Sequence, residues 1–135
     1  MAASKKNFYL EQGSNWERLI VCKDNTGTVV PIVGASAILT ARISPADVPL
    51  LLLTSAAGIV VNGAAGSMDI TISAALSSAI SVANLPPKIS APCEVDAAGN
   101  LQNKTGHPIP FQLEITQSGI PKRLVDGLFI FSPEC

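Results

Sequence analysis

The chain has 135 residues, the size of a single domain. Its net charge is −1 and its pI is about 5.7, so it lacks the excess of basic charge with which proteins attract nucleic acid. No apolar run approaches the roughly 18 residues that a membrane-spanning helix requires. The composition therefore predicts one domain, with neither nucleic acid nor a membrane as its partner.

The surface of this chain carries unusually few charges. Charged residues make up 14% of the sequence, against about 25% in a typical soluble domain. The mean hydropathy is +0.38, which is high for a protein that works as a soluble monomer. We therefore expect partner subunits to cover much of the surface.

The start of the chain carries a pair of lysines but lacks the apolar stretch of a secretory signal. We expect residues 1–6 to form a flexible arm and residues 7–135 to form one domain. Cys22, Cys93 and Cys135 lie far apart and are odd in number. This pattern indicates reduced thiols in a protein made in a cytoplasm.

Short strands with alternating apolar residues follow one another along the first half of the chain. The alternation is clear where Ala37, Leu39 and Ala41 share one face. Turn-forming pairs such as Asn62 and Gly63 separate the strands. The strands expected in this half are 7–12, 16–23, 28–32, 36–44, 50–54, 59–61 and 68–73.

The period changes after Ser73, where apolar residues recur with the spacing of a helix. This spacing predicts a short helix over 74–83, with Ser73 as its N-cap. Residues 81–108 then form a long loop of weak pattern, with room for a small hairpin between 91–95 and 101–104. Loops of this length in a compact domain usually have a function or a partner.

The final segment predicts the hairpin around which the other strands pack. Residues 111–115 alternate between apolar and polar, 117–121 supply a turn, and 124–131 return as a second strand. Residues 128–131 are apolar on both faces, so we expect this strand in the interior of a sheet and not at an exposed edge. About eight short strands with one helix predict an all-β domain, either a sandwich or a barrel.

No residue of the sequence stands out as catalytic, cofactor-binding or metal-binding. The one histidine, His107, lies between a glycine and a proline, and no cysteine or second histidine is near enough to complete a metal site. The carboxylates are scattered, although two of them could still meet in space. Lys122 and Arg123 are expected to be solvated charges at the end of a strand. We predict a protein that is not an enzyme and binds no cofactor.

Seven segments of the chain follow one another in a recognisable order. They are YLEQGSNW at 9–16, DNTGTVVPI at 24–32, AILTARIS at 37–44, GIVVNGAAGSMDITI at 58–72, FQLEI at 111–115, LVDG at 124–127 and SPE at 132–134. Together they resemble small virion proteins of tailed bacteriophages, in particular the N-terminal domain of baseplate upper proteins. The order and spacing of these segments carry the resemblance, since each alone is generic. The chain departs from the family pattern at 81–108, which is longer than the usual link before the penultimate strand.

The resemblance implies an immunoglobulin-like antiparallel β-sandwich with one short helix. It also implies a non-catalytic structural role in a virion, with many copies in a symmetric assembly made in the host bacterial cytoplasm. We expect a tail or baseplate protein that attaches fibres or joins tail components, and whose partners are other virion proteins. The arm 1–6 and the loop 81–108 are the expected contacts, because extended segments readily add to neighbouring chains.

Two other functions stay open. A capsid decoration protein would share the structural role but would occur in hundreds of copies per particle. A host-glycan-binding module would show an exposed aromatic side chain or a groove lined by carboxylates. An enzyme is the least favoured reading of this sequence.

Overall fold

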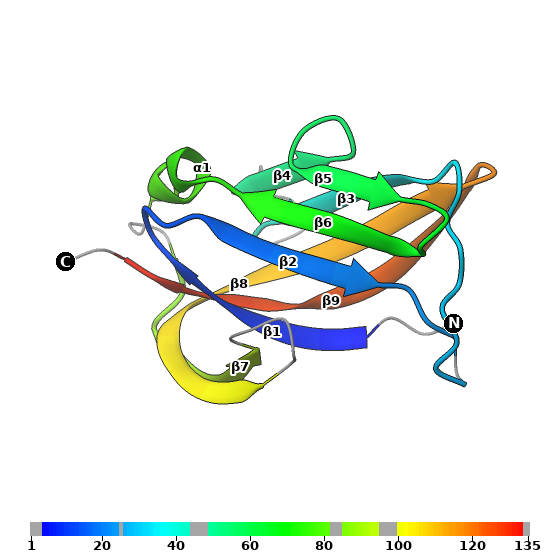
Figure 1. Ribbon diagram of the computed structural model, residues 1–135. Coiled ribbons are helices and arrows are strands. Elements are labelled where there is room, and N and C mark those ends of the chain that lie inside the picture. Colours follow the sequence, from blue (N-terminus) through cyan, green and yellow to red (C-terminus); the bar gives the residue numbers. More distant parts are fainter. Residues whose placement is uncertain (1–3, 25, 44–48, 82–84, 95–99, 134–135) are drawn as a thin grey trace.

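The computed structural model describes residues 4–24, 26–43, 49–81, 85–94 and 100–133 (Figure 1). The described chain is mostly β-strand with one short helix, so the all-β class is confirmed. The strands are β1 (Ser4–Glu11), β2 (Trp16–Val21), β3 (Ser36–Ala41), β4 (Leu51–Thr54), β5 (Ile59–Asn62), β6 (Ser67–Ile72), β7 (Ile89–Glu94), β8 (Leu101–Gln117) and β9 (Ile120–Ser132), and the helix is α1 (Ala74–Ser78).

The larger sheet is built on the long hairpin of β8 and β9. On one side of this hairpin β8 pairs with β3, and β3 pairs with β4 at the edge. On the other side β9 pairs with β1 along the whole of β1. The first part of β8 pairs with β7, which also touches β1. The strand 128–131 therefore lies between two neighbours, which confirms the expected interior position.

The sheet is mixed, and this corrects the expectation of purely antiparallel strands. β1 runs parallel to β9, with Ser4 opposite Val125 and Glu11 opposite Ser132. A hairpin forces antiparallel pairing only on strands that it joins directly. β1 continues instead into β2, which belongs to the other sheet, so its direction is free to follow that crossing.

The smaller sheet has the order β2-β6-β5, and it lies across the larger one with the core between them (Figure 1). Four aromatic rings form the centre of this core. The ring centroids of Phe111 and Phe129 are 4.6 Å apart, and those of Phe8 and Trp16 are 5.1 Å apart with their planes at 67°. Edge-to-face and tilted contacts of this kind add to the hydrophobic gain from burial.

The predicted alternation within strands is confirmed in β3, in β6 and in residues 109–115 of β8, where every second residue is buried. In β9 both faces are covered. Phe129 and Phe131 enter the main core, whereas Ile130 points the other way and is also fully buried. The start of β8 curls round beside β7 (Figure 1), and a Cβ at Gly106 in this segment would lie 3.0 Å from the Ile130 side chain.

Two local expectations need correction. Residues 28–32 do not form a strand, since only Val29 makes a bridge, to Lys23. The helix begins as predicted, with the Ser73 hydroxyl accepting the N–H of Leu76 at 3.3 Å. It ends at Ser78, because Ile80 turns into the core and is buried. Residues 82 and 83 of the predicted helix lie outside the described part of the chain.

The predicted arm and loop are both more regular than expected. Residues 4–6 of the arm belong to β1 and pair with Val125–Gly127, while 1–3 lie outside the described residues. The loop 81–108 contains β7 and the first part of β8, which pair from Ile89–Gly106 to Glu94–Leu101. This is the small hairpin for which the sequence left room. We call it the β7 hairpin.

Candidate functional site

A groove of about 750 Å³ runs over the outer face of the larger sheet. Strand pairing places its lining in rows across the sheet, because side chains that are opposite one another in register point to the same face. One row runs from Thr40 on β3 through Gln112 on β8 and Asp126 on β9 to Lys5 on β1. The next row includes Ile38 and Glu114. The groove is therefore built by four strands, with β1 as one wall.

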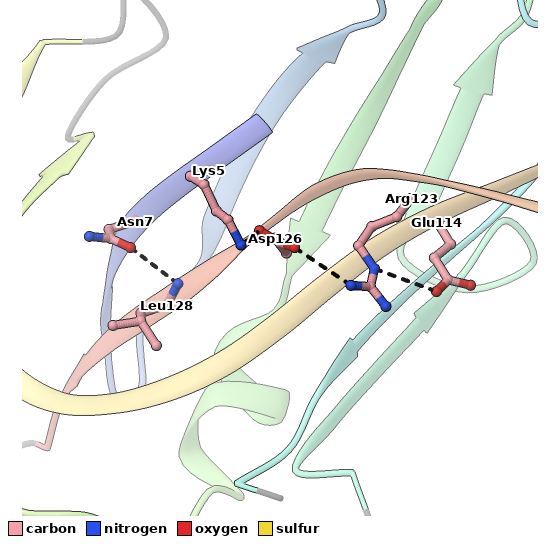
Figure 2. Close-up of polar contacts among 6 residues, drawn as sticks. All are labelled: Lys5, Asn7, Glu114, Arg123, Asp126 and Leu128. Carbon is pink, nitrogen blue, oxygen red and sulfur yellow. Dashed lines mark hydrogen bonds and ion pairs between the residues drawn. The ribbon is translucent and has the colours of Figure 1, made fainter. Parts of the chain in front are cut away.

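Charged side chains form a chain of ion pairs along this wall (Figure 2). Lys5 Nζ lies 2.7 Å from one carboxylate oxygen of Asp126, and Arg123 Nη1 lies 3.7 Å from the other. The Nε atom of Arg123 is also 3.9 Å from Glu114 Oε1. Partly exposed pairs of this kind contribute roughly 0.2–1 kcal/mol each. They set the local charge pattern more than they stabilise the fold.

The cations of this group are more exposed than the carboxylates. The Lys5 side chain is 81% exposed and that of Asp126 only 14%. Arg42 also lines the groove. Asp126 is recessed behind Lys5, and Glu114, at 38% exposed, is slightly less exposed than Arg123 at 46%, so the cations of these pairs stand nearest to an approaching partner.

A β-bulge brings Arg123 and Asp126 onto the same face. Leu113 pairs with Val125, but Glu114 pairs with Arg123, so Leu124 is the extra residue of β9. A bulge reverses the alternation of a strand locally and re-aims its side chains. Arg123 thus lies beside Glu114, and not simply in solvent at a strand end as the sequence suggests.

Apolar side chains lie beside these charges. Ile38 on β3 is 39% exposed, and Leu52, opposite Thr40 on the edge strand β4, is 55% exposed. Ile43 and Leu128 also line the groove. When large apolar side chains gather on one exposed face, that face is often an interaction site.

The backbone of β1 is held tightly against β9. The N–H of Leu128 donates to Asn7 Oδ1 at 3.2 Å (Figure 2). At Gly127 a Cβ would collide with the carbonyl oxygen of Lys6, so only glycine allows this approach. The wall of the groove that carries Lys5 is therefore positioned by main-chain packing and not by the ion pairs alone.

The two contact segments expected from the sequence lie side by side. Lys6 Nζ is 3.0 Å from Glu94 Oε1 on β7, and the Asn7 amide donates to the Pro92 carbonyl at 3.4 Å. A second hollow of about 360 Å³ lies between them, with Leu101 at its rim. The N-terminal strand and the β7 hairpin thus form one continuous surface next to the groove.

The histidine and the described cysteines that the sequence analysis considered have structural roles. The Nδ1–H of His107 donates to the Pro86 carbonyl at 2.6 Å and ties that segment to β8. Cys22 and Cys93 are buried thiols, and burial raises the pKa of each. Cys135 lies outside the described residues. Within the described ranges, no three His, Cys, Asp or Glu side chains are grouped as metal ligands would be. The same ranges contain no helix with the length and apolarity to cross a membrane.

The sequence did not single out the groove. The sequence signal for it was Ile38, an apolar residue at a position that the strand period assigns to the outer face together with Ser36 and Thr40. Comparison of the sequence with models of protein families and with curated proteins finds no match.

Proposed function

We propose that this chain is a structural, non-catalytic component of a tailed-bacteriophage virion. It sits in the tail or baseplate, where it attaches fibres or joins tail components, and it is present in several copies. The order of the segments that resemble small virion proteins supports this role. The ion pairing of Asp126 and Glu114 also fits it, because carboxylates held by Lys5 and Arg123 are occupied in electrostatic contacts.

One structural observation carries the proposal. Large apolar side chains stand in water on the outer faces of both sheets, including Leu52 on the larger sheet and Leu19 and Val60 on the smaller one. A domain with this surface gains stability when partners cover it, at about 25 cal/mol for each Å² of apolar surface removed from water. A subunit of a large assembly meets that condition.

We also propose that the fold is the immunoglobulin-like sandwich. When the strands are lettered along the chain, the smaller sheet β2-β6-β5 corresponds to strands B-E-D of that fold. The pairing of β4, β3, β8 and β9 corresponds to C′-C-F-G. The β7 hairpin is then an insertion before strand F, and β1 lies beside strand G.

The role is tested on particles. A phage that carries an epitope at an exposed site of this chain, for example at the β8–β9 turn, is purified, labelled with antibody and imaged. We expect label on the tail or baseplate, with a few to dozens of copies per particle by quantitative mass spectrometry. Hundreds of copies on the head would indicate the decoration protein instead. Purified particles that lack the chain would refute a virion role.

The groove favours one second candidate, a host-glycan-binding module. Two carboxylates, Glu114 and Asp126, line a hollow large enough for a sugar, and carboxylates bind sugar hydroxyls well. A glycan array probed with the purified protein tests this candidate. Binding that disappears in Asp126→Asn would support it, and an array without signal would remove it.

A further inference from the structure

The outer face of the smaller sheet has a charge pattern opposite to that of the groove. Asp69 on β6 pairs in register with Leu19 on β2 and with Val60 on β5, so one carboxylate stands between two apolar side chains. Leu19 is 51% exposed and Val60 is 61% exposed. Glu17 lies on the same face two residues before Leu19. We call Glu17, Leu19, Val60 and Asp69 the acidic face.

The charged residues at the outward positions of these three described strands are both acidic. Arg18 lies on β2 as well, but its guanidinium turns inward and stacks 5.4 Å from the ring centroid of Trp16. Asp69 is held by the Asn62 amide, which donates to its Oδ2 at 3.1 Å. The acidic face is therefore an apolar surface with fixed negative charge.

The outer face of the larger sheet is its complement. Lys5 and Arg123 supply positive charge around the apolar Ile38 and Leu52. We call these four residues the basic face. Each of the two cations is more exposed than the carboxylates it pairs with, so the positive ends of these ion pairs point toward a partner. The two faces lie on opposite sides of the molecule, since each is the outer surface of one of the two packed sheets.

We propose that the basic face of one copy of this chain binds the acidic face of the next copy. The apolar side chains of the two faces then leave water together, while opposite charges meet around them. Pairing of two basic faces or two acidic faces would bring like charges together. This head-to-tail contact is heterologous, so its repetition produces a ring if the rotation closes and a filament if it does not.

This inference deepens the proposed function, because it names a partner for the groove. It is nevertheless tested on the purified protein alone. Sedimentation velocity across a range of concentrations should show that the wild-type protein associates. The association should weaken as salt is raised from 50 mM to 500 mM. The reason is that the charges are exposed and the Debye length falls from about 14 Å to about 4 Å over this range. A wild-type protein that stays monomeric at millimolar concentration overturns the proposal.

Two substitutions separate the faces. Leu52→Asp places a negative charge on the basic face and Val60→Lys places a positive charge on the acidic face. Each position is more than half exposed, so the fold should persist, and circular dichroism and thermal unfolding check this. Each variant alone should associate at least about tenfold more weakly than wild type. Leu76→Asp on α1, an exposed apolar position outside both faces, is the matched control and should associate normally.

The mixture of the two variants decides the geometry. The Val60→Lys copy keeps an intact basic face and the Leu52→Asp copy keeps an intact acidic face, so an equimolar mixture should recover association. If Val60→Lys alone still forms dimers, the basic faces pair with each other, and if Leu52→Asp alone does so, the acidic faces pair. Either result overturns the head-to-tail contact. Loss of the chain from virions, with association intact, would refute only the proposed function.

Discussion

Gly127 tests whether the N-terminal strand is held by the main chain. In Gly127→Ala the new Cβ would overlap the carbonyl oxygen of Lys6, and its other close neighbours are also backbone atoms of Lys6. The backbone of Gly127 itself tolerates alanine, because its φ is not in the left-handed region. The strain must therefore move β1 away from β9.

The cost can be estimated from that overlap. Inserting a methyl group into a well-packed site costs about 1–3 kcal/mol. Displacement of β1 would also weaken the ion pair between Lys5 and Asp126, which adds roughly 0.2–1 kcal/mol at most. For a domain of this size the two costs together correspond to a fall in melting temperature of roughly 4–14 °C. Urea unfolding and differential scanning calorimetry measure the two quantities.

A truncated chain provides the control. A fusion cleaved so that the chain starts at Asn7 lacks Lys6, which supplies the three atoms nearest to the new Cβ. In this background Gly127→Ala should change the free energy of unfolding by less than about 0.5 kcal/mol. If the substitution destabilises the full and truncated chains equally, the close approach of β1 is not the cause and the reasoning fails.

Three further predictions concern the core, a buried hydroxyl and a turn. Phe129→Ala should lower the free energy of unfolding by about 3–5 kcal/mol, because this fully buried ring contacts three other aromatic rings; a loss below 1 kcal/mol in urea unfolding would contradict the core. Ser77→Ala should cost about 1–3 kcal/mol, since its buried hydroxyl accepts the Gly13 N–H at 3.0 Å and donates to the Ser14 carbonyl at 2.9 Å; a thermal melt unchanged from wild type would argue against that link. Asp24 accepts hydrogen bonds from two threonines of its own turn, and these bonds hold the pKa of its carboxyl group below the ordinary value. The ionised carboxylate therefore stabilises the fold above pH about 4, and this stabilisation disappears as the pH falls through the lowered pKa. Asp24→Asn should remove that part of the acid sensitivity, and an NMR titration that finds an ordinary pKa for Asp24 would exclude the effect.

Local chemistry determined the elements of this protein. The period of two in 36–41 and 111–115 divides each strand into an apolar and a more polar face, because neighbouring side chains of a strand point to opposite faces. The Ser73 hydroxyl caps the helix through an N–H only three residues away. The apolar run 128–131 predicts a strand covered on both faces, and its residues 129–131 are fully buried. Each of these features depends on residues close in sequence.

Only the tertiary structure decided the features that carry the proposed contacts. The direction of β1 depends on which sheet receives the next strand, and its closeness to Gly127 depends on pairing across more than a hundred residues. The bulge at Leu124 places Arg123 and Asp126 on one face, although the strand period alone would separate them. Whether Leu19 or Ile20 faces water likewise depends on which side of β2 meets the second sheet. Sequence periodicity can divide a strand into two faces, but only packing selects the face that stays exposed.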